Sequence, residues 1–312
     1  MTEWSVTEPQ KIPLTDPVTT LRVRVVNGAV NVVGTDESSA RLEISEIDGP
    51  PLIVSQEGST LTVSYEDMQW KGILKWLDRK GHKRRVVVSV AVPAGTEVEV
   101  GAVAAETVIS GIKGRTAVRG VTGDTTLVGL AGPVRAESVS GSLQAQSLTG
   151  ALHANSVTGD ITVIDGAGSS VKAETVSGDM VIDLDPAAEP AGPPADIRLT
   201  SVSGEVSIRL PQPADARVEA STTTGSVSNA FDDLRVGGGW GAKSISGTLG
   251  AGRGTLKATT ISGAIALLRR PEPEPELDAD LDSDGGSGPT AAAADSTADS
   301  TETATPASGK VL

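Results

Sequence analysis

Glycine recurs at a fixed interval of nine residues through the middle of the chain, and this spacing constrains the fold more than any other feature. The strict series is Gly114, Gly123, Gly132, Gly141, Gly150, Gly159 and Gly168. Each interval has room for one turn and one strand of about five alternating residues. It is too short for a helical crossover between parallel strands, and so many glycines oppose helices. The pattern therefore predicts stacked β-strands.

Alternate glycines lie in a stronger motif, in which valine and a hydroxyl residue precede the glycine. Examples are Val121-Thr122-Gly123-Asp124 and Val157-Thr158-Gly159-Asp160, and the motif returns at wider spacing as Val202-Ser203-Gly204-Glu205. Glycine permits the positive φ of a sharp corner, and the Ser or Thr before it can hydrogen-bond to local backbone and hold the turn. Because strong and weak corners alternate, we predict a single-stranded parallel β-solenoid (β-helix) with coils of about 18 residues and two unlike corners.

The remaining segments differ from this repeat. Residues 1–100 contain alternating apolar strands around Asn27-Gly28, which predicts an N-terminal β module that caps the solenoid of residues 101–269. Residues 270–312 begin with Pro-Glu repeats and are poor in large apolar residues, so we expect a disordered acidic tail. Within the solenoid, residues 186–194 and 237–241 are predicted to be loops. The predicted fold class is thus all-β.

One basic segment interrupts the acidic sequence. Residues 65–85 have apolar side chains at helical spacing, and residues 70–85 contain seven Lys or Arg against one acid. This concentration of charge and tryptophan makes the segment the candidate membrane or partner surface. Its residues are Trp70, Lys71, Lys75, Trp76, Arg79, Lys80, Lys83, Arg84 and Arg85.

Three interpretations of the basic segment remain open. It can be a structural cap, with its tryptophans packed on the end of the solenoid and its charges solvated. It can be an interfacial surface, with Trp and Leu among the lipid headgroups and the cations on anionic lipid. It can also bind an acidic protein partner, of which the chain's own tail is one example.

The sequence offers no constellation for catalysis, so we predict a protein that is not an enzyme and has no cofactor. Of the two histidines, neither His82 nor His153 is marked as a base, and His153 is expected to face solvent from a strand. Asp124, Asp160 and Asp179 follow corner glycines and are predicted to form a ladder of turn residues rather than a metal site. The absence of cysteine excludes disulfides and thiolate metal sites.

Charge and the terminal sequence suggest a location and exclude one class of partner. Residues 271–312 supply nine of the fourteen excess negative charges, so the rest of the chain is mildly acidic. This argues against general binding of nucleic acid. Neither a secretory signal nor an apolar run long enough for a membrane helix is evident, so a cytoplasmic protein is expected. Self-association through the ends of the solenoid is a further prediction.

The corner motifs resemble the bacterial β-strand-repeat family of adhesin-like proteins that is also called the toastrack domain. The stretch 25–34, VVNGAVNVVG, is similar to the N-terminal part of actinobacterial members. The resemblance covers about residues 15–269 and implies a parallel β-solenoid. In several members it also implies an association with envelope-stress systems of the phage-shock and antibiotic-sensing kind, often on a membrane-anchored partner. It supplies no catalytic residues.

These observations favour a non-enzymatic structural or binding protein, expected to be a scaffold or sensor module linked to envelope stress or the membrane surface. An exported, adhesin-like surface protein is the alternative. A polysaccharide-active β-helix enzyme is a third reading, which the lack of a carboxylate cluster and of aromatic residues disfavours.

Overall fold

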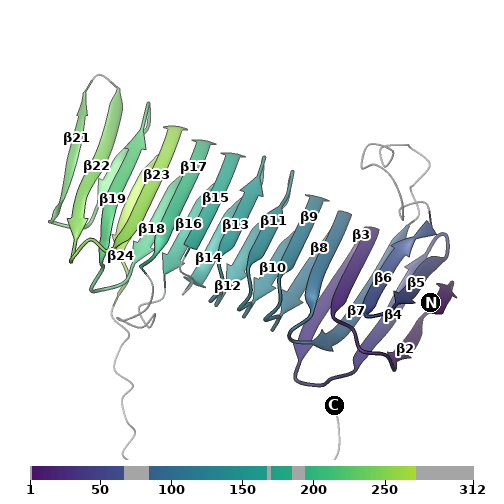
Figure 1. Ribbon diagram of the computed structural model, residues 1–312. Coiled ribbons are helices and arrows are strands. Elements are labelled where there is room, and N and C mark those ends of the chain that lie inside the picture. The colour runs from purple at the N-terminus through teal and green to yellow at the C-terminus, as the bar shows by residue number, and fades with distance from the viewer. Residues whose placement is uncertain (1, 67–83, 167–169, 185–193, 240, 272–312) are drawn as a thin grey trace, which may run out of the picture. The chain divides into compact units, whose positions relative to one another are not determined.

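The computed structural model describes residues 2–66, 84–166, 170–184, 194–239 and 241–271 (Figure 1). All of them belong to the first of two compact units, Met1–Glu272 and Pro273–Leu312. Every extended regular element in this part of the chain is a β-strand, which confirms the predicted all-β class.

Each coil of the repeat contributes one strand to each of two parallel sheets, here called the front sheet and the back sheet. The front sheet contains β9 (Thr116–Thr122), β11 (Val134–Glu137), β13 (Leu152–Ser156), β15 (Ser170–Ser177), β17 (Asp196–Ser203) and β23 (Gly254–Ser262). The back sheet contains β10 (Thr125–Val128), β12 (Leu143–Gln146), β14 (Ile161–Gly166), β16 (Met180–Leu184), β18 (Val206–Leu210) and β24 (Ile265–Arg269).

The register of the strands gives the length of a coil. In the back sheet Thr125 pairs with Leu143, and Leu143 pairs with Ile161, so successive coils are offset by 18 residues. The front sheet has the same offset between Val134 and Leu152. The next step, from Ile161 to Met180, is one residue longer. The predicted parallel solenoid with an 18-residue coil is confirmed.

The two corners of the coil explain the nine-residue spacing of glycine. At Gly141 φ is +116°, and a Cβ atom there would lie 2.3 Å from the carbonyl oxygen of Gly123 in the preceding coil. At the opposite corner a Cβ on Gly132 would lie 2.2 Å from the carbonyl oxygen of Gly114. Any side chain at these positions would push adjacent coils apart, so stacking at strand distance requires glycine.

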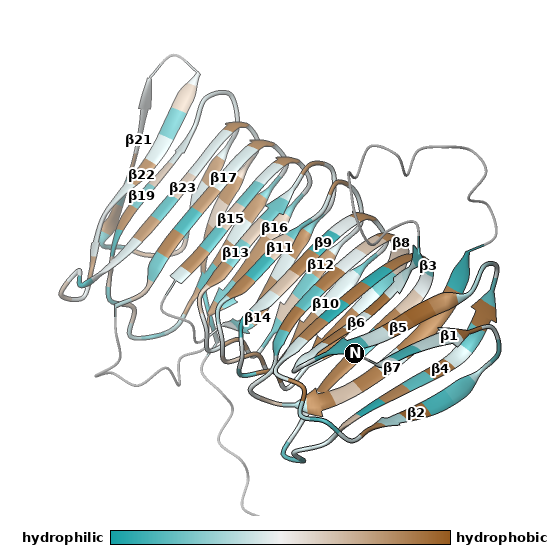
Figure 2. Cartoon of the chain, turned by 45° about the vertical axis from the view of Figure 1, so that its right-hand side comes forward, coloured by the Kyte–Doolittle hydropathy of each residue, from teal (hydrophilic) through white to brown (hydrophobic). Residues whose placement is uncertain are grey.

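Side chains alternate between the core and the outer surface along each strand, as Figure 2 shows by hydropathy. In β14 the side chains of Ile161 and Val163 are buried, whereas Ile164 is exposed. Leu130 and Leu148, at the edge between the two sheets, are also buried. The core is therefore a narrow column of aliphatic residues with few aromatic ones, as β-branched residues on stacked strands allow.

Polar side chains at the corners bind consecutive coils to each other. The Asp160 carboxylate accepts the backbone N–H of Asp179 at 2.8 Å, and the Asp179 carboxylate accepts that of Glu205 at 2.7 Å. The Thr158 hydroxyl donates to the carbonyl of Val139 at 3.1 Å. The predicted aspartate ladder exists, but these bonds join neighbouring coils. The prediction that the hydroxyl residues hold their own turn is wrong at Thr158.

The N-terminal strands continue the same stack. They are β1 (Thr2–Val6), β2 (Gln10–Leu14), β3 (Thr20–Thr35), β4 (Ala40–Asp48), β5 (Leu52–Glu57), β6 (Thr60–Tyr65), β7 (Arg85–Pro93) and β8 (Glu97–Ser110). The long strands β3 and β8 run through both sheets and pair with each other in parallel. The parallel ladder thus begins at Thr20 and continues across the predicted boundary at residue 100.

The coils at the C-terminal end do not follow chain order. Four strands precede the last coil in sequence: β19 (Ala216–Thr222), β20 (Val227–Asn229), β21 (Leu234–Gly239) and β22 (Ala242–Leu249). Strand β23 nevertheless lies between β17 and β19, and β24 lies between β18 and β20. The prediction of a loop over 237–241 is wrong at Gly237–Gly239, which belong to β21.

Candidate interaction surfaces

The segment that carries the predicted basic surface lies between β6 and β7 in sequence. Of its nine residues, only Arg84 and Arg85 are among those that the structure describes. The other seven, Trp70, Lys71, Lys75, Trp76, Arg79, Lys80 and Lys83, lie outside the described residues. The same holds for most of the predicted helix and for the predicted loop over 186–194, of which only residue 194 is described.

The two ends of the basic segment are fixed beside each other. Tyr65 is the last residue of β6 and is 1% exposed. The guanidinium carbon of Arg84 lies 5.4 Å from the centre of the Tyr65 ring, within the range of a cation–π contact. The Nε atom of Arg85 lies 3.4 Å from a carboxylate oxygen of Glu46 on β4. Tyr65 and Arg85 are strand residues, so the predicted helix is wrong at both of its ends.

An open hollow of about 510 Å³ adjoins these ends. Its lining combines prolines and an isoleucine with one acid and one cation: Ser5, Pro50, Pro51, Ile53, Tyr65, Glu66 and Arg84. Because Glu66 and Arg84 flank residues 67–83 in sequence, the described chain ends and resumes at this hollow.

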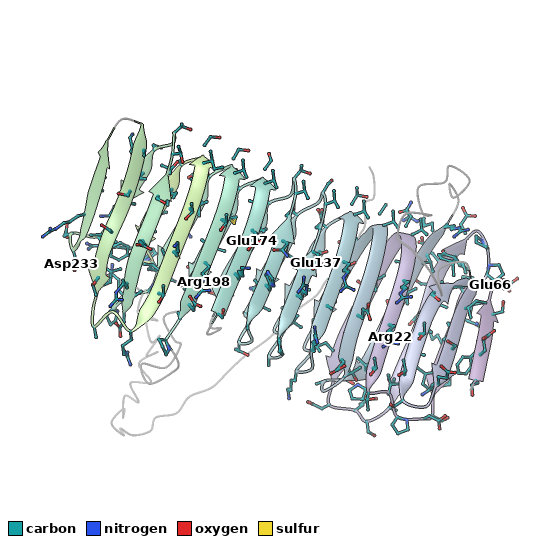
Figure 3. The ribbon with its side chains drawn as sticks, turned by 45° about the horizontal axis from the view of Figure 1, so that its top comes forward. Arg22, Glu66, Glu137, Glu174, Arg198 and Asp233 are labelled. Atoms are coloured by element: carbon teal, nitrogen blue, oxygen red, sulfur yellow. The ribbon has the colours of Figure 1, made fainter. Side chains whose placement is uncertain are left out.

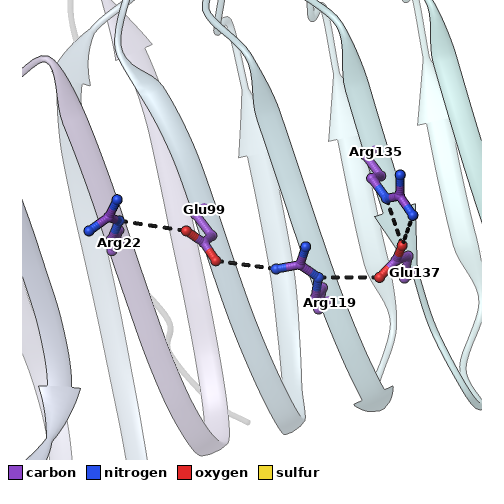
Figure 4. A network of polar contacts seen from close by, with 5 residues as sticks. All are labelled: Arg22, Glu99, Arg119, Arg135 and Glu137. Atoms are coloured by element: carbon purple, nitrogen blue, oxygen red, sulfur yellow. Dashed lines mark hydrogen bonds and ion pairs between the residues drawn. The ribbon is translucent and has the colours of Figure 1, made fainter. Parts of the chain in front are cut away.

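The outer side of the front sheet carries a second set of charges. Figures 3 and 4 show these side chains along successive strands. Glu99 bridges Arg22 at 3.6 Å and Arg119 at 3.2 Å, and Arg119 also contacts Glu137 at 3.2 Å. Glu137 accepts a further bond of 2.6 Å from Nε of Arg135. One chain of alternating charges therefore spans β3, β8, β9 and β11.

The ion pairs on the front sheet favour the charged carboxylates. The hydrogen bond from Arg135 lowers the pKa of Glu137, with a smaller opposing effect of burial and added help from Arg119. The hydrogen bond from Lys172, at 2.8 Å, lowers the pKa of Glu174 in the same way. Because acids and cations alternate and largely compensate one another, this face is a poor candidate for attracting a highly charged polymer.

His153 lies within this charged face. Its register neighbours on the adjacent strands are Arg135 and Lys172. The side chain points outward from β13, as predicted, but it is half-buried, and its Nε2 atom is enclosed without a hydrogen-bond partner among the described residues. The expectation of a fully solvent-facing histidine is therefore too simple.

The outer side of the back sheet is almost uncharged. The register row that crosses its middle consists of Val108, Thr126, Gln144, Thr162, Val181 and Ser207. Ile164 and Val181 are 42% and 38% exposed. Charge returns toward both ends. Beyond Val108 the row continues through Asn31 and Ser89 to the ion pair of Glu43 and Lys11 at 3.2 Å. On the other side Arg270 bonds to Asp165 at 2.6 Å and to Asp183 at 3.2 Å. The two faces of one solenoid thus differ in chemistry.

A buried row of hydroxyl residues, three positions before five of the corner glycines, was not anticipated from the sequence. Its members Ser156, Thr175, Ser201, Thr260 and Thr222 occupy consecutive rungs. The Ser156 hydroxyl accepts the N–H of Gly159 at 2.9 Å, and the Thr222 hydroxyl accepts that of Gly225 at 3.0 Å. From Ser156 onward these corners share the pattern Ser/Thr-x-x-Gly, and the recurring first hydroxyl residue is the signal that could have revealed the row.

Metal binding and membrane spanning were also assessed on the described residues. Within them, no three His, Asp or Glu side chains come together as metal ligands would. The corner aspartates face backbone N–H groups instead. No helix in these parts of the chain has the length and apolar character needed to cross a bilayer.

Comparison with known families decides the identity of the fold. The model of the Toastrack DUF4097 family matches residues 18–268. The chain belongs to the toastrack family. This confirms the resemblance that the corner motifs indicated. The matched region of this toastrack protein extends from just before β3 to the end of β24, so it includes the whole parallel stack. No curated protein matches the sequence significantly.

Solved structures with similarity to this toastrack protein have low sequence identity. One is a "putative cell adhesion protein" from Clostridium sporogenes, with 12% identity, a TM-score of 0.29 and coverage of 84% of this chain and 100% of that one. Another is a "putative lipid binding protein" from Parabacteroides distasonis, with 10% identity and a TM-score of 0.37, covering 86% and 98% of the two chains. A third, from the same organism, is a "putative adhesin" with 10% identity, a TM-score of 0.29 and coverage of 86% and 97%.

Proposed function

We propose that this toastrack protein is a non-enzymatic cytoplasmic scaffold that binds an anionic membrane surface through its basic segment and serves in the response to envelope stress. The observation that carries the proposal is that the two ends of that segment, Glu66 and Arg84, line one hollow, where Arg84 lies on the ring of Tyr65. Residues 67–83, between these two ends, contain five Lys or Arg against Asp67 and Asp78, a net charge of +3. This charge is distinct from the compensated charges of the front sheet.

The chemistry of the segment suits an anionic lipid surface. Tryptophan prefers the boundary between headgroups and acyl chains, and each basic residue near such a surface contributes about 1 kcal/mol. Residues 67–83 contain two tryptophans, three leucine or isoleucine residues at helical spacing, and five Lys or Arg. The combination of apolar and cationic side chains distinguishes this segment from the ion-paired front sheet, whose described strands offer cations but no exposed aromatic residue beside them.

The proposal is tested by co-sedimentation of the full chain with phosphatidylglycerol-containing vesicles and with phosphatidylcholine vesicles, at low and high salt. We expect binding to the anionic vesicles that high salt weakens. The variants W70A/W76A and K71Q/K75Q/K80Q/K83Q should each reduce binding at least tenfold. A control with the same charge change on the front sheet, R119Q/R135Q/R198Q/K257Q, should retain it.

Four outcomes would contradict the proposal or a part of it. Equal binding to neutral and anionic vesicles, or equal loss in the front-sheet control, would remove the specific role of the basic segment. Absence of vesicle binding would leave the segment as a structural cap or as a site for an acidic protein. Recovery of the native protein only from the cell exterior would contradict the cytoplasmic part and favour the exported, adhesin-like alternative.

A further inference from the structure

The two ends of the stack differ in how their edge strands are protected. At the N-terminal end, β1 pairs only with β5 and β2 pairs only with β4 among the described strands. Strand β1 carries Glu3, and strand β2 carries Lys11 and Pro13. Short edges, charge and proline are the common devices that prevent edge strands from pairing with another chain. This end of the solenoid is therefore closed to further strands.

At the C-terminal end, β20 and β21 are the corresponding edges in the described part of the chain. Strand β20 has three residues and is protected by its shortness. Strand β21 has six residues and pairs with β22 alone among the described strands. It contains one charged residue, Arg235, and no proline, and all of its residues after Leu234 are exposed. It is the longest of these four edge strands and has neither proline nor shortness to protect it, with Arg235 as its one charge.

The side chains of β21 leave room for a second backbone. Gly237, Gly238 and Gly239 have no side chains to keep another strand away. Val236 is 58% exposed, the highest value among the large apolar residues of the described chain. Because β21 and β22 already form an antiparallel ladder, an added antiparallel strand would continue the existing sheet.

We propose that β21 pairs antiparallel with β21 of a second copy, which joins two solenoids at their C-terminal ends. A two-fold axis through Gly237 would place Gly237 opposite its own copy, Val236 opposite Gly238 and Arg235 opposite Gly239. No like charges then face each other across the new pair, and each valine is covered by the partner's glycine backbone. Such pairing is isologous, so it closes at a dimer and does not propagate into a fibre.

The interface is one six-residue strand on each side, which is small for a protein–protein contact. We therefore expect reversible dimerisation that is visible at micromolar concentration and above. The proposal assigns the predicted self-association of the solenoid to its C-terminal end and to one strand, β21. It does not depend on the basic segment, which lies at the opposite end of the ladder of strands.

The first test is sedimentation equilibrium of the full chain over a range of concentrations. The variant Gly237→Lys places two lysines beside the two-fold axis. A Cβ at Gly237 fits, because its nearest contact is Ser244 Oγ at 3.6 Å. We expect this variant to raise the dissociation constant of the dimer at least tenfold. The matched control is Gly95→Lys, where a Cβ meets no atom within 4 Å, and it should leave the dimer unchanged.

The second test uses the absence of cysteine in the chain. The single variant Gly237→Cys should form disulfide-linked dimers on mild oxidation, because its position lies opposite its own copy, whereas Gly95→Cys should not. A protein that is monomeric at every concentration would overturn the proposal, and so would a dimer that Gly237→Lys does not weaken. Cross-linking of Gly95→Cys as efficient as that of Gly237→Cys would also overturn it.

Discussion

The front and back sheets share one framework but present opposite surfaces. Both have the same register, the same alternation of buried aliphatic residues and the same glycine corners. The front sheet is covered by alternating charges, whereas the back sheet presents Val, Thr, Gln and Ser. The comparison teaches that the corners and the inner residues specify this fold. The outer residues are not needed for it and are free to serve other purposes.

The largest expected effect concerns the framework that the two sheets share. Gly141→Ala should lower the free energy of unfolding by about 3 kcal/mol, because it combines a positive φ with a Cβ that crowds the preceding coil. Chemical denaturation measures this loss. Gly95→Ala, where the added methyl group meets no atom within 4 Å, is the control and should change stability by less than about 0.5 kcal/mol. Equal effects of the two would show that the corners do not specify the stack.

A smaller effect is expected for the front sheet alone. Arg119→Gln removes the cation that joins Glu99 to Glu137. Because these groups are exposed, the loss should be about 1 kcal/mol or less at low ionic strength and should fade in high salt. The matched change on the back sheet, Gln144→Ala, should have no salt-dependent effect. A salt-dependent loss on both faces would contradict the chemical difference between them.

The smallest effect is a dependence on pH that only the front sheet should show. Since the pKa of Glu137 lies below its ordinary value of 4.5 in the folded protein, the charged form contributes stability above that ordinary value. This contribution is lost as the pH falls through the lowered pKa. Thermal unfolding from about pH 7 to about pH 3 should therefore show a shallower acid decline for Glu137→Gln than for the wild type. An identical decline would mean that the ion pair has no effect on stability.

The sequence was sufficient to predict the repeat and its period. Glycine at every ninth position predicted a coil of 18 residues with two unlike corners, and the register from Thr125 to Leu143 confirms it. The prediction succeeded because a glycine corner is a local requirement that each coil repeats. The same reasoning explains why the positions of the corner aspartates could be predicted from the sequence, whereas the groups that they hydrogen-bond could not. Those partners, such as the N–H of Asp179 for Asp160, belong to the next coil.

The order of the last coils could not be predicted, because their spacing in sequence gives no information on their neighbours in space. Strand β23 inserts between β17 and β19 across long stretches of chain. The glycines of β21 resembled a loop because three consecutive glycines carry no alternating pattern. For the basic segment, the sequence predicted where charge and tryptophan gather. The contacts of Arg84 and Arg85 that fix its end required the structure.

The most direct test of the account is hydrogen exchange of the full chain with and without anionic vesicles. The account predicts that vesicles slow exchange in peptides covering residues 60–90 and leave the strands of both the front and the back sheet unchanged. Slowed exchange along either face, with residues 60–90 unaffected, would contradict the claim that the solenoid is a framework that presents one binding segment at its N-terminal end.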